Sequence, residues 1–83
     1  MVKEIKEERL IELLAKVFEI DRAEVNENSS PDTIEKWDSL HHMSLIVALE
    51  ETFQIELTEE QTLDILNYQL IKITLQEHGI SFN

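Results

Sequence analysis

The sequence contains no cysteine, one glycine, one proline and only 6% aromatic residues in 83 positions. The lack of cysteine excludes a disulfide framework, a thiolate nucleophile and a cysteine-ligated zinc site. So few turn-forming residues disfavour a fold of many short strands. No apolar run approaches the roughly 20 residues of a membrane span, and the N-terminus lacks the apolar core of a signal peptide. We therefore expect a single cytoplasmic domain over residues 1–83, built from helices around one small core.

Basic residues are also scarce, with seven against 18 acidic residues and a formal net charge of −11. Phosphate backbones and anionic lipids repel such a surface, so neither nucleic-acid nor membrane binding is expected. Residues 37–71 contain no lysine or arginine. Seven acidic residues fall in this stretch: Asp38, Glu50, Glu51, Glu56, Glu59, Glu60 and Asp64. The stretch is either a solvated face or a docking surface that steers basic partners.

Apolar residues recur at helical spacing in four segments separated by capping signals. The first helix is expected over residues 3–19, and the second over 39–53 with Asp38 or Ser39 as its N-cap. A capping box that starts at Thr58 predicts a short third helix to about residue 65. A fourth helix begins after Asn67 and ends at Gly79.

The polar segment 20–37 is predicted to be a long connection held to the core by Val25, Ile34 and Trp37. The expected fold is therefore all-α: a small four-helix bundle with three longer helices, a short third helix and a long loop between helices 1 and 2.

The second helix carries two apolar faces when its residues are advanced by about 100° each. One face is expected to belong to the core and consists of Leu45, Ile46, Leu49 and Phe53. The other contains Leu40, Met43 and Val47, flanked by Glu50 and Glu51. In a small bundle this second face is predicted to be exposed and to contact partners. The alternative is that the helix is central and buried on both sides.

Ser39 begins this helix directly after the long connection, and three roles are open to it. It can be a simple N-cap. A catalytic nucleophile is not expected, because there is no G-x-S-x-G elbow and His41 and His42 lie too close in sequence for a triad. Those histidines also point about 100° apart, which disfavours a shared metal ion, so we expect neither enzyme activity nor a metal site. The third role is modification by another enzyme, since the amides at a helix N-terminus suit a phosphodiester.

The run Trp37-Asp38-Ser39-Leu40, followed by LIVALEETFQIEL at residues 45–57, resembles the acyl carrier proteins. These proteins carry 4′-phosphopantetheine on the serine of an Asp-Ser-Leu motif, and the resemblance extends over about residues 3–79. It implies that a phosphopantetheinyl transferase loads Ser39 from coenzyme A, with Asp38 and Leu40 completing the motif. The thiol of the arm would then carry acyl groups as thioesters, and the carrier would be a monomer that catalyses nothing itself.

The resemblance also implies two surfaces. Acyl-activating, acyltransferase or ketosynthase-type enzymes would dock on an apolar and acidic face made of Leu40, Met43, Val47, Glu50, Glu51, Glu56, Glu59 and Glu60. An acyl chain would enter a pocket between helices made of Leu45, Ile46, Leu49, Phe53, Ile65 and Leu70.

The sequence departs from many fatty-acid-synthesis carriers close to the motif. His41 and Ser44 stand where those carriers have acidic residues, and Trp37 stands where a small residue is frequent. This favours a carrier for a specialised pathway that is polyketide-like, nonribosomal or related to surface polysaccharides, with fatty acid synthesis as the alternative. Two other functions are open: an aminoacyl or peptidyl carrier for a stand-alone ligase, and a helical adaptor that is never modified.

Overall fold

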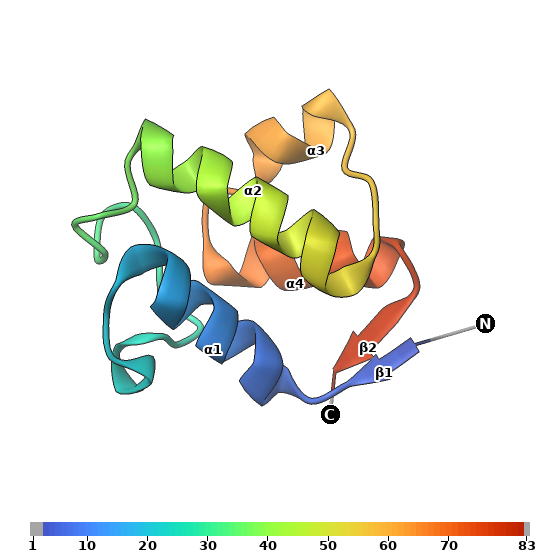
Figure 1. The fold of residues 1–83 in the computed structure, drawn as a ribbon, viewed down its shortest axis with the longest axis horizontal. Coiled ribbons are helices and arrows are strands. Elements are labelled where there is room, and N and C mark those ends of the chain that lie inside the picture. The colour runs from blue at the N-terminus through green and yellow to red at the C-terminus, as the bar shows by residue number, and fades with distance from the viewer. Residues whose placement is uncertain (1–2, 83) are drawn as a thin grey trace.

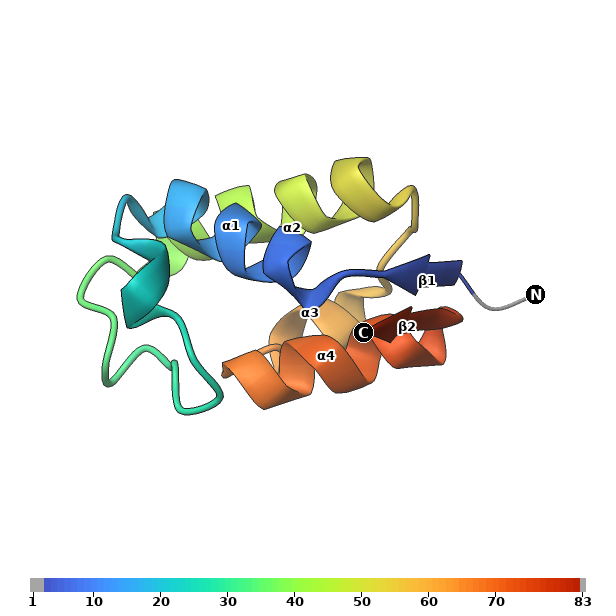
Figure 2. The same cartoon turned by 90° about the horizontal axis from the view of Figure 1, so that it is seen from below.

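The computed structural model describes residues 3–82. Its helices are α1 (Glu7–Phe18), the short 3₁₀ helix η1 (Arg22–Glu24), α2 (Ser39–Phe53), α3 (Glu59–Asp64) and α4 (Tyr68–Glu77), and its strands are β1 (Lys3–Ile5) and β2 (Ile80–Phe82). Helices α1 and α2 form one layer, and α3 and α4 form the other (Figures 1 and 2). The prediction of four helices with a long connection after the first is confirmed. None of the helices in residues 3–82 has the length and apolar character needed to cross a membrane.

The first helix is shorter than expected. It begins at Glu7 rather than at residue 3, and its buried face consists of Leu10, Leu13, Leu14 and Phe18. It ends where Glu19 adopts a left-handed conformation with φ 54°. Ile5, which matched the helical period, is buried but belongs to strand β1.

A two-stranded parallel sheet was not predicted. Lys3 pairs with Ile80, Glu4 with Ser81 and Ile5 with Phe82, at the end of the molecule opposite the long connection (Figure 2). Gly79 makes this pairing possible, because its φ of 83° turns the chain away from α4 and into β2. Three-residue strands are too short to show the alternation by which strands are recognised in a sequence.

The long connection between α1 and α2 is tied to the core at several points. Val25, Ile34 and Trp37 are buried as predicted, and Trp37 stacks on Phe18 of α1 with ring centroids 4.8 Å apart. The backbone N–H of Tyr68 donates to the carbonyl of Ser29 at 2.9 Å, which joins the connection to the first turn of α4. These contacts hold the segment that precedes Ser39.

The core lies between the two layers. Its largest fully buried side chains include Phe18 of α1, Leu45 and Leu49 of α2, and Tyr68 and Ile71 of α4. Helix α3 contributes no buried residue within its bounds, whereas Ile65, directly after it, is completely buried. The short helix is therefore the least deeply anchored of the four.

Candidate functional site at the start of α2

Ser39 is the first residue of α2, and the side chain of Asp38 caps the helix. One carboxylate oxygen of Asp38 accepts from the backbone N–H of His41 at 2.9 Å. Of the two N-caps left open by the sequence, Asp38 is therefore the one used. The Ser39 side chain is exposed, and among residues 3–82 its hydroxyl makes no hydrogen bond. The hydroxyl is therefore accessible to solvent.

His41 lies between two carboxylates that come from different elements. Its Nδ1 lies 2.9 Å from Oδ1 of Asp38, and its Nε2 lies 3.7 Å from Oε2 of Glu19 at the end of α1. The hydrogen bonds from the His41 backbone and side chain hold the pKa of Asp38 below its ordinary value. Asp38 is consequently ionised at neutral pH, one residue before Ser39.

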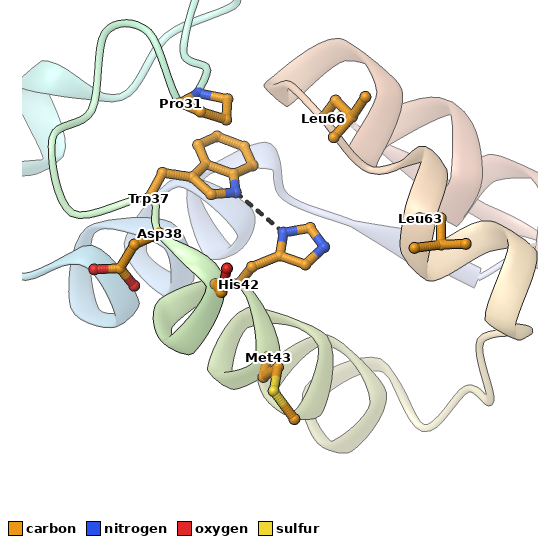
Figure 3. Close-up of a pocket in the computed structure, with 8 residues that line it drawn as sticks. Pro31, Trp37, Asp38, His42, Met43, Leu63 and Leu66 are labelled. Atoms are coloured by element: carbon orange, nitrogen blue, oxygen red, sulfur yellow. Dashed lines mark hydrogen bonds between the residues drawn. The ribbon is translucent and has the colours of Figure 1, made fainter.

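An open groove of about 480 Å³ begins at Ser39. Trp37, Asp38 and Ser39 line it where the connection meets α2, with His42 and Met43 one turn further along the helix. Its other residues are Pro31, Leu63 and Leu66. Figure 3 shows Pro31 and Trp37 on one side and Leu63 and Leu66 on the other, with His42 between them. A chain attached to the Ser39 hydroxyl would start at the edge of this groove.

His42 connects the two sides of the groove. The indole Nε1–H of Trp37 donates to Nδ1 of His42 at 3.1 Å, and Nε2 of His42 lies 2.9 Å from the carbonyl oxygen of Thr62 in α3 (Figure 3 shows the first contact). His42 is partly buried, and both of its ring nitrogens have hydrogen-bond partners. With Trp37 and His42 paired to each other and to Thr62, the lining beside Ser39 is mainly apolar.

The two faces of α2 are arranged as predicted. Leu45, Leu49 and Phe53 are buried, and Ile46 is partly buried against them. On the other face, the exposed fractions are 72% for Leu40, 68% for Met43 and 52% for Val47. The alternative in which α2 is buried on both sides is wrong.

Two exposed leucines beyond α2 were not singled out from the sequence. Leu63 is 69% exposed and Leu66 is 57% exposed, and both line the groove together with Met43. A signal was present, because Leu63, Ile65 and Leu66 are three apolar residues within four positions. A short surface helix cannot turn all of them inward, and Ile65 alone is buried.

The side chains expected to form an acyl-chain pocket do not lie in the groove. Leu45, Leu49, Phe53 and Ile65 lie in the closed core with exposed fractions of 2% or less. Ile46 and Leu70 are partly buried. None of the six lines the groove that begins at Ser39. The cavity adjacent to the serine is therefore formed by a different set of residues.

The acidic residues proposed for docking differ in how far their side chains are exposed. Glu51, Glu56, Glu59 and Glu60 are exposed. Glu50 is half-buried, and its carboxylate accepts from the backbone N–H of Leu57 at 2.9 Å, which fixes the turn between α2 and α3. Glu50 thus has a structural role that the sequence did not indicate.

Comparison with models of protein families finds no match to this chain.

Proposed function

We propose that this protein is an acyl carrier that bears 4′-phosphopantetheine on Ser39 and presents acyl thioesters to partner enzymes. The observation that carries the proposal is the position of Ser39: an exposed, unpaired hydroxyl at the first residue of α2, at the edge of an apolar groove. The protein itself catalyses no step in this proposal. A tethered cargo would meet successive active sites at an effective concentration that free diffusion does not give.

In the proposed loading reaction, Ser39 Oγ attacks the phosphorus of coenzyme A that carries the pantetheine. The bond from that phosphorus to the bridging oxygen breaks, and adenosine 3′,5′-bisphosphate leaves. The serine proton passes to a base of the phosphopantetheinyl transferase, with Mg²⁺ bound to the pyrophosphate. The first turn of α2 supplies positive backbone potential for the new phosphodiester, which the ionised Asp38 partly opposes. Coenzyme A as the donor favours a cytoplasmic location.

Partner enzymes would bind the exposed face of α2. Leu40, Met43 and Val47 offer an apolar contact. The stretch 37–71, to which they belong, contains seven acidic residues and no lysine or arginine. An apolar centre with a charged rim is the usual anatomy of a specific interface. A basic acyltransferase-type or ketosynthase-type partner fits this surface.

The apolar lining of the groove supports an acyl cargo over an aminoacyl cargo. An ammonium group would lose hydration there. The only carboxylate in the lining is that of Asp38, and it is already bound by His41. Leu63, Leu66 and Trp37 instead offer apolar contact to a hydrocarbon chain. We propose that the pathway is a specialised one, because His41 and Ser44 replace acidic residues beside the motif.

The test of the proposal is an intact-mass spectrum after incubation with a phosphopantetheinyl transferase, coenzyme A and Mg²⁺. The wild-type protein and Ser44→Ala, which changes the nearest other serine on α2, are expected to gain the mass of one phosphopantetheine. Ser39→Ala is expected to stay folded and gain none. An unmodified but folded wild-type protein would favour the adaptor function.

A further inference from the structure

The partners of His42 determine which of its nitrogens carries the proton. The indole of Trp37 is only a donor, so Nδ1 of His42, 3.1 Å away, must accept. The carbonyl of Thr62 is only an acceptor, so Nε2, 2.9 Å away, must donate. Both bonds can exist only when the imidazole is neutral with its hydrogen on Nε2. The corner where the long connection, α2 and α3 meet therefore requires one protonation state and one tautomer.

Helix α3 depends on few other attachments. It has six residues and none of them is buried. Besides the His42 bond to Thr62, the side chain of Gln61 lies 3.0 Å from Nε2 of His78 in the turn after α4. Of these two histidines, only His42 also forms a hydrogen bond with Trp37 on the opposite side of the groove. His42 is thus hydrogen-bonded both to Trp37 on one side of the groove and to α3 on the other.

We propose that neutral His42 is a pH-sensitive latch that holds α3 and Trp37 across the groove beside Ser39. When Nδ1 takes a proton, two N–H donors face each other where the Trp37 bond was. The indole loses its acceptor, whereas the bond from Nε2 to Thr62 remains. Trp37 and the wall that it forms with Pro31 are then no longer held to His42 and α3. This goes beyond the carrier function, and it holds whether or not Ser39 is modified.

The charged groups around His42 leave its added proton without a carboxylate partner. Asp38, on the preceding turn, lines the same groove but is engaged by His41. Glu19 of α1 pairs with His41 and with Lys36 of the connection. On α3, the side chains of Glu59, Glu60 and Asp64 are exposed to solvent, and His78 is the titratable group that reaches α3 from the α4 end. Within residues 3–82, no ion pair involves His42.

Trp37 is the single tryptophan, so its indole N–H gives one resolved NMR signal. The full-length protein would be titrated from pH 8 to pH 5 while the ¹⁵N shifts of the histidine rings and the exchange of the indole N–H are followed. At pH 8, His42 should show an unprotonated Nδ1 and a protonated Nε2. The indole signal should shift in step with the ring signals of His42 as the pH falls. Its exchange should become roughly two- to tenfold faster after correction for intrinsic rate.

His41→Gln and His78→Gln are the matched controls, because each removes another histidine near this corner and leaves the Trp37 bond. Both should keep the indole transition, and His42→Phe should abolish it and show an unprotected indole at every pH. The titration of the wild-type protein decides the question even if His42→Phe does not fold. A proton on Nδ1 at pH 8, or an indole signal that does not move as His42 titrates, would overturn the proposal.

Discussion

The hydroxyl of Tyr68 donates a 2.6 Å hydrogen bond to Oε2 of Glu7, joining the first turn of α4 to the first turn of α1. Lys72 approaches the other oxygen of the same carboxylate at 3.1 Å. The Tyr68 hydrogen bond, with Lys72, lowers the pKa of Glu7 although partial burial opposes this. Burial, followed by the same hydrogen bond, raises the pKa of Tyr68. The two helices are thus coupled by an ionised Glu7 and a neutral phenol.

Tyr68→Phe should remove this coupling and little else, because the ring keeps its volume in the core. We expect the free energy of unfolding to fall by about 1–2 kcal/mol at pH 7, as for a hydrogen bond to a charged group that is partly exposed. Since the pKa of Glu7 is lowered by folding, its stabilisation is present above the unfolded value and is lost as the pH falls through the folded value. Urea unfolding of both proteins should therefore give a smaller difference at about pH 3 than at pH 7.

Glu8→Gln is the control for that comparison, because Glu8 is exposed in the same turn of α1. It should change stability by less than about 0.5 kcal/mol at either pH. An equal loss in Tyr68→Phe at both pH values would show that the effect comes from packing and not from the bond to Glu7.

The two faces of α2 should respond in opposite ways to truncation. Leu49→Ala should cost about 2–5 kcal/mol of unfolding free energy because it leaves a cavity in a small core. Met43→Ala and Val47→Ala should cost less than about 1 kcal/mol, because both side chains are exposed. The exposed variants should nevertheless slow transfer of the arm or acylation by a partner. Urea denaturation measures the loss of stability, and transferase kinetics measure the rate of arm transfer. Unimpaired transfer in Met43→Ala and Val47→Ala would show that the partner does not bind this face of α2.

Glu51→Lys should slow the transferase reaction more at low salt than at high salt, because ions screen steering between exposed charges. Glu51 is a cleaner choice than Glu50, whose carboxylate also holds the Leu57 backbone. Glu77→Lys, at the end of α4, makes the same change in net charge away from Ser39 and serves as the control. Equal slowing in both variants would mean that total charge, and not a local surface, sets the rate.

The excess of negative charge should make stability depend on ionic strength. With a formal net charge of −11, mutual repulsion destabilises the folded protein in dilute buffer at neutral pH. Added NaCl should raise the melting temperature by screening, and a divalent cation should do so at lower concentration. Thermal unfolding monitored by circular dichroism at several salt concentrations measures this. A melting temperature indifferent to salt would contradict the interpretation of the charge.

The sequence predicted those features that depend on residues close together in the chain. The start of α2 at Asp38 and the two faces of that helix depend on residues within one helix, so capping rules and the helical period were sufficient. Ile5 was misassigned because its strand partner, Phe82, lies at the far end of the chain.

The groove could not be predicted either, because its residues come from segments far apart in the sequence. Trp37 and Leu63 line the same groove only because the chain brings α3 back to the first turns of α2. The bond between Glu50 and Leu57 depends on how the turn between those helices closes. The tautomer of His42 likewise follows from a carbonyl twenty residues away. Such contacts are tertiary, and no local pattern encodes them.

The most direct test of the carrier proposal is the location of the added group after treatment with transferase and coenzyme A. Residues 37–71 contain no lysine or arginine, so trypsin releases residues 37–72 as one peptide in which Ser39 and Ser44 are the only serines. Tandem mass spectrometry of this peptide should place a single phosphopantetheine on Ser39. A group on Ser44, or on a peptide that contains another serine, would contradict the account.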